Sequence, residues 1–394
     1  MRILIVSEPG LDGVFRHVEV LLRYLLDHGH GVLFAWSDRR TSDRLFALVE
    51  EIERRGGTTL RLSVGNAPVP GDARALWQLA AFARQHQPEV IHAHSSKAGG
   101  LVRLLPLLGV RATFVYTPHA YFRMHDPRGV KTHLFHLVEA ILGRVGWTAS
   151  LSPSEERFAV ERLRLPPERL RRIQNGVDPA HFAPAAPAEV ARLRAEWGLP
   201  PGARVLGTLG RYSMQKDPVT LYRALALALA ELPELYFLHV GKGELEPEVE
   251  EIIRQHGLSS RVRRVPYLPD PLGFYRCLDG FILTSLYEGM SYALLEALAL
   301  NLPLILTRAP GSEQFAELGL THLSWADAGD APSVASAIRE WFRACAAGSR
   351  PNHREVTIEL LSEEKCCGEL CRLYEGTRAE SEAGDAQPTP AARP

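Results

Sequence analysis

The sequence predicts two α/β domains, each built on a doubly wound parallel sheet with helices on both faces. A chain of 394 residues with 46% hydrophobic content can bury two cores, because a single core usually stops growing before that length. Short apolar runs alternate with amphipathic segments in both halves, and this alternation is typical of parallel strands joined by helices. An Ala- and Pro-rich stretch at 179–187 separates the two alternations, as expected of an interdomain linker.

The first domain is expected to cover residues 1–178. A buried strand at 3–6 is followed by a Gly-bearing loop at 9–13 and an amphipathic helix at 15–28, which is the order of a strand–loop–helix unit. Five further strands are predicted, with helices between most of them, at 31–35, 60–64, 90–94, 113–117 and 149–152.

After a linker at 179–190, the second domain is expected at 191–362. Its strands are predicted at 204–209, 236–240, 262–265, 280–284 and 303–307. A helix at 363–377 is expected to pack back on the first domain, and the segment 378–394 carries almost no large apolar side chain, which predicts a disordered tail. Two such domains joined by a short linker are expected to form a cleft at the carboxyl ends of their sheets, where ligands bind in open α/β folds.

Composition and charge exclude several classes of protein. The 45 basic and 46 acidic residues nearly balance, so no nucleic-acid partner is expected. The five cysteines show no metal-ligand spacing and are predicted to be reduced thiols. No apolar run has the length of a signal-peptide core or of a membrane span of about 20 residues. We therefore expect a cytoplasmic protein.

The strongest functional motif runs from a predicted strand into a helix that is expected to open near Met290. Two carboxylates, Glu288 and Glu296, bracket this helix start. Backbone N–H groups at Gly289, Met290 and Ser291 are expected to lie at the positive end of the helix dipole, where they can hold a phosphate or sugar oxygen. Because a carboxylate accepts hydrogen bonds from vicinal hydroxyls, Glu296 suits a ribose and Glu288 suits a sugar ring.

A second motif lies at the end of the strand predicted at 204–209. The strand ends at Gly210 and Arg211, and Lys216 follows five residues later, before the next helix. Two cations at a strand exit suit a diphosphate, because they can neutralise the charge that develops on a phosphate leaving group.

These two motifs, in this order, resemble the C-terminal domain of family-4 retaining glycosyltransferases of GT-B fold, including bacterial surface-polysaccharide glycosyltransferases. The segment Asn175-Gly-Val-Asp178 also matches the interdomain segment of that family. The resemblance extends over nearly all of the chain that precedes the predicted tail. It implies that Glu288 contacts the donor sugar, Glu296 the ribose, and Arg211 and Lys216 the diphosphate.

The resemblance continues in the first half of the chain. His94 and Lys97 follow one predicted strand, and His119 and Tyr121 follow the next. The resemblance implies that His119 approaches the donor sugar, and it places His94, Lys97 and Tyr121 on the acceptor side. In the first loop Gly13 is the best candidate for a backbone contact to the donor, although the Gly-Gly pair common in the family is missing.

No metal or other cofactor is expected, and the nucleotide sugar, of UDP or GDP type, is a substrate. The chain has no Asp-x-Asp element, which is the metal-binding signature of the other large glycosyltransferase fold, and nothing in the sequence supplies further metal ligands beside His92 and His94. The resemblance implies front-face attack, in which the departing phosphate takes the acceptor proton.

Two other functions stay open. Sugar-nucleotide 2-epimerases share the two-domain fold, but they need additional acid/base carboxylates in the first domain, where Glu8 and Asp12 are the only candidates on the cleft side. A non-catalytic glycan-binding module is the third reading. Incubation of the protein with a nucleotide sugar alone separates an epimerase from a transferase.

The acceptor is expected to be a glycan or a lipid-linked glycan. Basic residues outnumber acidic ones in the first domain, and the stretches 100–111 and 130–147 are apolar with embedded Arg residues. Helices of this kind can lie on a membrane surface. We therefore expect peripheral contact with the inner membrane face through basic side chains, namely Arg103, Arg123, Arg128 and Lys131.

Overall fold

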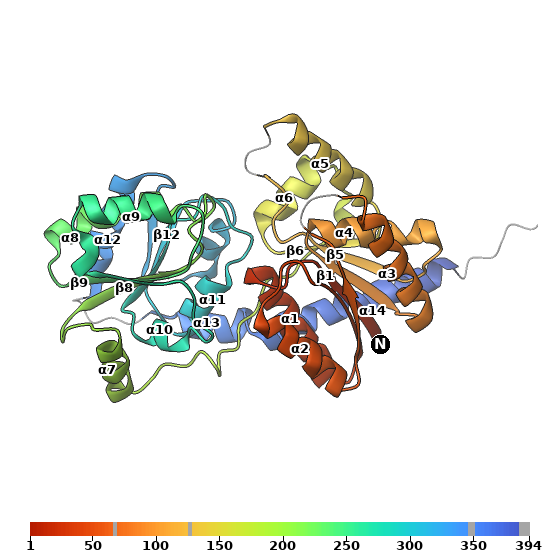
Figure 1. The fold of residues 1–394 in the computed structure, drawn as a ribbon, viewed down its shortest axis with the longest axis horizontal. Coiled ribbons are helices and arrows are strands. Elements are labelled where there is room, and N and C mark those ends of the chain that lie inside the picture. The colour runs from red at the N-terminus through yellow and green to blue at the C-terminus, as the bar shows by residue number, and fades with distance from the viewer. Residues whose placement is uncertain (66–68, 125–127, 346–350, 386–394) are drawn as a thin grey trace, which may run out of the picture. The chain divides into compact units, whose positions relative to one another are not determined.

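A computed structural model describes residues 1–65, 69–124, 128–345 and 351–385 (Figure 1). The chain divides into two units. The first contains Met1–Asn175 together with the segment that begins at Glu363, and the second contains Gly176–Ser362. The second unit thus begins three residues before the domain boundary that the sequence suggests at Asp178.

A seven-stranded parallel sheet organises the first unit. Its strands, in sheet order, are β3 (Thr58–Leu62), β2 (Gly31–Ser37), β1 (Arg2–Ser7), β4 (Val90–His94), β5 (Thr113–Thr117), β6 (Trp147–Ser150) and β7 (Leu170–Arg172). The strand order reverses between β1 and β4, and in that register Ser7 lies opposite His94, which in turn lies opposite Thr117. The carboxyl ends of the central strands therefore meet at the switch point of the sheet.

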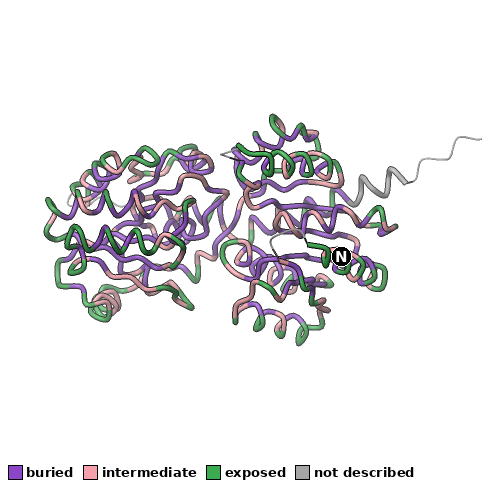
Figure 2. The backbone as a smooth tube through the Cα atoms, turned by 45° about the horizontal axis from the view of Figure 1, so that its top comes forward, coloured by how far each residue is buried: buried purple, intermediate pink, exposed green. Residues whose placement is uncertain are grey.

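Helices cover both faces of this sheet. They are α1 (Asp12–Asp27), α2 (Asp43–Arg54), α3 (Asp72–His86), α4 (Ser96–Val102), α5 (Val130–Leu142) and α6 (Pro153–Glu161), with 3-10 segments at Leu105–Leu108 and Pro167–Arg169. Successive residues of β1 point to opposite faces, so that Ile3 and Ile5 belong to one core cluster and Leu4 and Val6 to the other. Figure 2 shows buried strands inside the unit and exposed residues along the outer helices.

The last helix, α14 (Glu363–Asp385), belongs to the first unit. Leu370 and Tyr374 on α14 pack into the same core cluster as Ile3 and Ile5. This helix continues through residues 378–385, where a disordered tail was expected. The rest of that expected tail, 386–394, lies outside the described residues.

A six-stranded parallel sheet organises the second unit, in the order β10 (Val262–Val265), β9 (Leu235–Val240), β8 (Arg204–Leu209), β11 (Gly280–Leu283), β12 (Leu304–Thr307) and β13 (Leu323–Ala326). Its helices are α7 (Pro187–Glu196), α8 (Pro218–Glu231), α9 (Glu246–Gln255), α10 (Leu272–Arg276), α11 (Tyr292–Ala299), α12 (Ala331–Cys345) and α13 (His353–Leu360), with 3-10 segments at Leu258–Ser260 and Glu313–Leu318. The order reverses between β8 and β11, so the loops that follow these two strands meet at the switch point. Helix α7 begins inside the stretch that was expected to be a linker.

Candidate functional site

The loops after β8 and β11 bring together the residues that the sequence singles out in the second unit. A small pocket at the strand ends is lined by Thr208, Gly210, Arg211, Lys216, His239 and Thr284, among others. The loop after β8 passes close to the loop after β9, because a Cβ atom at Gly241 would lie 2.0 Å from the carbonyl oxygen of Gly210. Arg211 is exposed at this pocket and Lys216 is half-buried.

An ion pair joins the two motifs. Lys216 Nζ lies 2.5 Å from Glu288 Oε1, and their side chains are 18% and 8% exposed. The hydroxyl of Ser285 donates a second hydrogen bond to the same carboxylate oxygen over 2.5 Å. Thr284 Oγ1 donates to the backbone carbonyl of Lys216 over 3.1 Å. The cation is therefore held beside the carboxylate by two loops that are far apart in the sequence.

The backbone at Glu288 is fixed by the loop after β12. The Glu288 N–H donates to the carbonyl of Pro310 over 2.8 Å. Gly311 has a φ of +88°, and a Cβ atom there would lie 2.0 Å from the Glu288 carbonyl oxygen. Position 311 therefore needs glycine for two reasons, the left-handed backbone and the close approach.

The helix after Glu288 starts later than predicted. Ser291 is the N-cap of α11, so the helix begins two residues beyond Met290. The N-cap side chain makes no capping hydrogen bond, and the backbone N–H groups of the first turn have no partner within the helix. Gly289 is held from outside, because Gln314 Nε2 donates to its carbonyl over 3.2 Å.

Glu296 lies inside the protein rather than on a solvated helix face. Every residue of α11 is buried, and Glu296 is 7% exposed. Burial and the nearby Glu296 charge raise the pKa of Tyr275 well above its ordinary value, and the Tyr275 hydroxyl donates to the backbone carbonyl of Ala293 over 3.1 Å.

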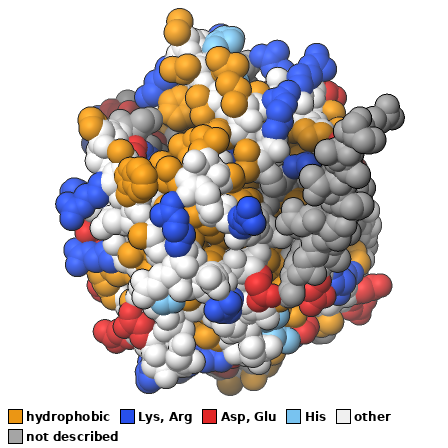
Figure 3. All heavy atoms as spheres, turned by 90° about the vertical axis from the view of Figure 1, so that its right-hand side faces the viewer, with side chains coloured by type: hydrophobic (Ala, Val, Ile, Leu, Met, Phe, Trp, Pro, Cys, Tyr) orange, Lys and Arg blue, Asp and Glu red, His pale blue; other side chains and the backbone are white. Residues whose placement is uncertain are grey.

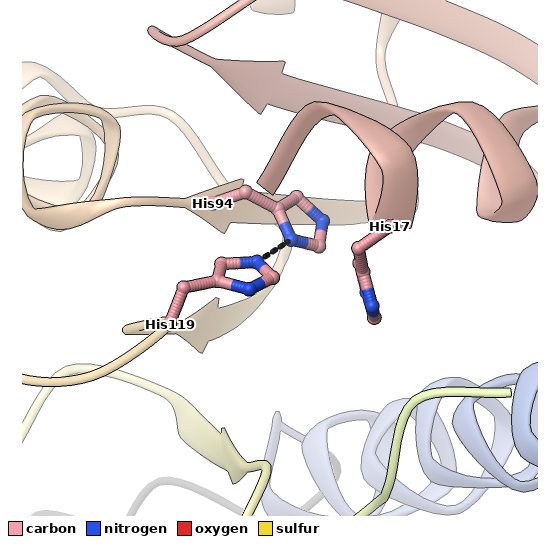
Figure 4. Close-up of side chains that lie close together, drawn as sticks. All are labelled: His17, His94 and His119. Carbon is pink, nitrogen blue, oxygen red and sulfur yellow. Dashed lines mark hydrogen bonds between the residues drawn. The ribbon is translucent and has the colours of Figure 1, made fainter. Parts of the chain in front are cut away.

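In the first unit the ends of β4 and β5 bring histidines together with one from α1 (Figure 4). His94 Nδ1 and His119 Nε2 lie 3.1 Å apart and share a hydrogen bond. The ring centroid of His17 lies 5.0 Å from that of His94 and 4.9 Å from that of His119. Sequence reasoning missed His17, because its neighbours His94 and His119 lie about 77 and 102 residues later in the chain.

One nitrogen from each of these three imidazoles lies within 4.8 Å of the other two. The expectation that nothing supplies further candidate metal ligands beside His94 is therefore wrong, because His17 and His119 offer them. Their sequence spacing gives no metal-binding signature. His92 instead bonds Tyr374 Oη over 2.6 Å and Thr117 Oγ1 over 2.9 Å.

The histidines of the cluster are neutral near pH 7. Burial lowers the pKa of His17 to about 4. Burial also holds the pKa values of His92, His94 and His119 well below their ordinary value. Removing an imidazolium from water is unfavourable unless an anion compensates it.

A buried carboxylate, Glu155, supports the loop that carries His119. His119 and its neighbour Ala120 have φ values of 54° and 73°, a conformation that non-glycine residues rarely adopt. Glu155 accepts hydrogen bonds from the N–H groups of Ala120 over 2.6 Å and Leu151 over 2.8 Å. Burial raises the pKa of Glu155 to about 7. The sequence motifs gave no indication of this role.

The other residues predicted in the first unit have different environments. Lys97 pairs with Asp72 over 2.6 Å and its side chain is only 8% exposed. Tyr121 lies in the hydrophobic core beside Phe158, with ring centroids 5.3 Å apart. The structure therefore does not bring Tyr121 to the surface beside His119. Gly13 lies in the first turn of α1, and a Cβ atom added there would have no neighbour within 4 Å.

The two carboxylates considered for epimerase chemistry also differ. Glu8 is buried, and Arg40 lies 3.2 Å from its carboxylate. Burial raises the pKa of Glu8, and the positive charge of Arg40 opposes that shift. Asp12 begins α1 with a φ of 65°.

One of the four basic residues expected on a membrane surface, Arg103, lies in the core instead. Arg103 is buried, lies 2.8 Å from Glu139 and stacks over the ring of Tyr116 at 4.1 Å. A guanidinium that is paired in the core satisfies its charge there and is not available to lipids. Arg123, Arg128 and Lys131 are exposed. None of the helices in the described part of the chain has the length and apolar character needed to cross a membrane.

Comparison with known proteins agrees with this architecture. The family model described as glycosyltransferase family 4 matches residues 11–181, and that of the group 1 glycosyl transferases matches residues 203–343. The Escherichia coli UDP-Gal:alpha-D-GlcNAc-diphosphoundecaprenol alpha-1,3-galactosyltransferase is 27% identical over 61% of this chain, a match that spans 63% of that relative. The chain thus covers less than two thirds of that relative.

Two solved structures show the same fold over both units. Anabaena HepE superposes with a TM-score of 0.77 at 18% identity, covering 95% of this chain and 100% of the other. Sucrose-phosphate synthase from Thermosynechococcus elongatus superposes with a TM-score of 0.81 at 20% identity, covering 96% and 100%.

Proposed function

Because the chain belongs to the family-4 glycosyltransferases of GT-B fold, we propose that it transfers a sugar from a nucleotide diphosphate sugar to a hydroxyl of a glycan or lipid-linked acceptor, with retention of configuration. The observation that carries this proposal is the ion pair of Lys216 and Glu288 at the switch point of the second sheet. Arg211 lines the same pocket as Lys216. Glu296, eight residues after Glu288 in the sequence, is buried.

Each of these groups has a role that its chemistry suits. Arg211 and Lys216 hold the diphosphate and stabilise its charge as it leaves. Glu288 binds the sugar ring and Glu296 the ribose, since both carboxylates accept hydrogen bonds from hydroxyl groups. The N–H groups of Gly289, Met290 and Ser291 and the backbone of Gly210 complete the donor contacts, and Gly13 adds one from the first unit.

The reaction needs no side-chain nucleophile in this proposal. The acceptor hydroxyl attacks from the face that the diphosphate leaves, and the departing phosphate takes its proton. The enzyme then acts by positioning the two substrates and by stabilising charge. His119, neutral at pH 7, contributes a hydrogen bond to the donor sugar, and His94 and Lys97 lie on the acceptor side.

A thermal-shift panel tests the function directly. We expect a UDP or GDP nucleotide to raise the melting temperature, because a ligand at 100 times its Kd stabilises the folded state by about 2.7 kcal/mol. UDP sugars come first, since the Escherichia coli relative uses UDP-Gal, as its name states. Dependence of the shift on Glu296, tested with Glu296→Ala, distinguishes the proposed site from nonspecific binding. A panel of UDP, GDP, ADP and dTDP sugars that gives no shift would contradict the proposal.

Epimerase activity is the alternative that the same fold permits. An epimerase would convert the nucleotide sugar in the absence of an acceptor, whereas the proposed transferase would leave it unchanged apart from slow hydrolysis. The ion pair of Glu8 with Arg40 disfavours a role for Glu8 as a free acid/base group. A glycan-binding module would bind no nucleotide sugar, so the thermal-shift panel separates it as well.

The acceptor side of the proposal involves a membrane surface, and helix α5 is its main support. Five apolar side chains on α5 are at least 43% exposed, namely Val130, Leu134, Leu137, Val138 and Ile141. The only acidic residue of α5, Glu139, points inward and pairs with Arg103. The outer face of α5 therefore combines apolar side chains with the basic Lys131 and carries no exposed acid. Helix α5 lies at the top of Figure 1, and the top of Figure 3 shows hydrophobic side chains beside Lys and Arg.

We expect the protein to bind vesicles that contain anionic lipid, and expect added salt to weaken the binding. Each Lys or Arg near an anionic surface contributes about 1 kcal/mol, and this attraction is screened by salt. Combined replacement of Arg123, Arg128 and Lys131 by Gln should weaken binding, as should Leu134→Gln with Leu137→Gln. Flotation with vesicles of anionic and of neutral lipid measures both effects.

Two controls match these variants outside the first unit. Leu227→Gln removes an apolar side chain that is 44% exposed on α8, and Arg254→Gln removes an exposed charge on α9. Both should leave vesicle binding unchanged. No binding to anionic vesicles at low salt would favour a soluble acceptor.

A further inference from the structure

The cluster of His17, His94 and His119 has the spacing of a metal-ligand set. In a tetrahedral zinc site the bond from zinc to a histidine nitrogen is about 2.0–2.1 Å, so two ligand nitrogens lie about 3.3 Å apart. His94 Nδ1 and His119 Nε2 are 3.1 Å apart, and one nitrogen from each of His17, His94 and His119 lies within 4.8 Å of those of the other two. An ion can therefore replace the proton that the two imidazoles share, provided that His17 moves inward slightly.

His17 is already oriented as a metal ligand would be. Its Nδ1 lies 2.8 Å from the side-chain oxygen of Asn175, and an amide oxygen only accepts, so Nδ1 carries the proton. Its Nε2 is then a free lone pair, and this atom is buried and has no hydrogen-bond partner among the described residues. A histidine that ligates a metal usually donates its other N–H to an oxygen acceptor, which fixes the tautomer and the ring.

The remaining requirements are also met. The ligands are neutral imidazoles, because burial keeps the pKa values of all three low, so binding releases few protons. The ligands come from three separate elements: α1, the end of β4 and the loop after β5. His119 is only partly buried, which leaves a route for an ion and a position for a fourth ligand.

We propose that His17, His94 and His119 form a binding site for one borderline transition-metal ion, such as Zn²⁺ or Co²⁺, with a water or substrate oxygen in the fourth position. Imidazole nitrogen suits these ions and does not suit Mg²⁺ or Ca²⁺. The ion inhibits the enzyme, because His119 cannot bind the metal and the donor sugar at once. This inhibitory role rests on the proposed function, whereas the metal site itself does not.

Titration of tag-free protein with CoCl₂ tests the site, because tetrahedral Co²⁺ absorbs visible light strongly. We expect one Co²⁺ per chain, displaced by Zn²⁺. His17→Gln and His94→Gln should each weaken binding at least about 100-fold, and Asn175→Ala should weaken it about 10–100-fold through the second shell. The control is His133→Gln, which replaces an exposed histidine on α5. Far-UV circular dichroism and a melting curve establish that each variant is folded.

Two results would overturn the metal site: no absorption band in the wild type, or an undiminished band in a folded His17→Gln variant. Addition of the nucleotide sugar then tests the inhibitory role separately. We expect the donor to displace Co²⁺. If Co²⁺ stays bound while the donor binds elsewhere, the metal site stands and the proposed contact of His119 with the donor is wrong.

Discussion

Replacement of Lys216 or Arg211 by alanine should lower turnover about 10²–10³-fold, which is the usual effect of removing a preorganised charge contact. Lys216 lies 2.5 Å from Glu288, so its loss also removes the cation beside a buried carboxylate, to which the Ser285 hydroxyl still donates. Arg211 is exposed at the same pocket and should act on the diphosphate. Steady-state kinetics with saturating acceptor measures both effects.

Arg254→Ala is the matched control, because Arg254 is an exposed cation on α9 whose partner is a neighbouring surface residue, Glu251. Its kinetics should equal those of the wild type. The wild type should also stay active in the presence of a chelator. Activity that depends strictly on an added divalent metal would contradict the assignment of Arg211 and Lys216 as the charges that stabilise the leaving group.

The two carboxylates of the donor site should have separable effects. Glu296→Ala should mainly weaken nucleotide binding, since Glu296 holds the ribose, whereas Glu288→Gln should mainly lower turnover. A lost hydrogen bond to a charged group is worth about 1.5–3 kcal/mol, so each effect should be about 10–150-fold. Calorimetric titration of the nucleotide and steady-state kinetics give the two quantities.

A surface variant, Glu248→Gln, provides the comparison for both, because Glu248 is an exposed acid in the first turn of α9. Wild-type kinetics and binding in both donor-site variants would refute the assignment. A loss of stability in Glu296→Ala must be measured as well, since Glu296 is buried and its charge acts on the buried hydroxyl of Tyr275.

The two sheets could be predicted because their central strands are apolar runs bounded by helices. The strands that the sequence did not reveal, β7 and β13, lie at the sheet edges. The sequence of β7 is Leu-Arg-Arg. It has no apolar run to recognise, because an edge strand has a neighbouring strand on one side only and can leave polar side chains exposed. The helix at 378–385 was also missed. Its lack of large apolar side chains suggested disorder, but Ala and Glu favour helix formation.

The donor residues were recognisable because each lies in a short motif next to a strand. The partners that hold the first-unit loops were not, because they come from distant parts of the chain. His17 reaches His94 from α1, and Glu155 holds Ala120 from α6. Arg103 shows the converse. Its sequence context suggested a surface cation, but its partner Glu139 lies 36 residues away and draws it into the core.

The loop that carries Glu288 should be sensitive to mutations at Gly311. This glycine supplies no side chain to any ligand, yet a single methyl group there would collide with the carbonyl of Glu288. Among alleles that abolish function, substitutions at codon 311 should therefore occur beside those at codon 288. A catalogue of variants that considers only ligand-contacting positions would misclassify them as harmless.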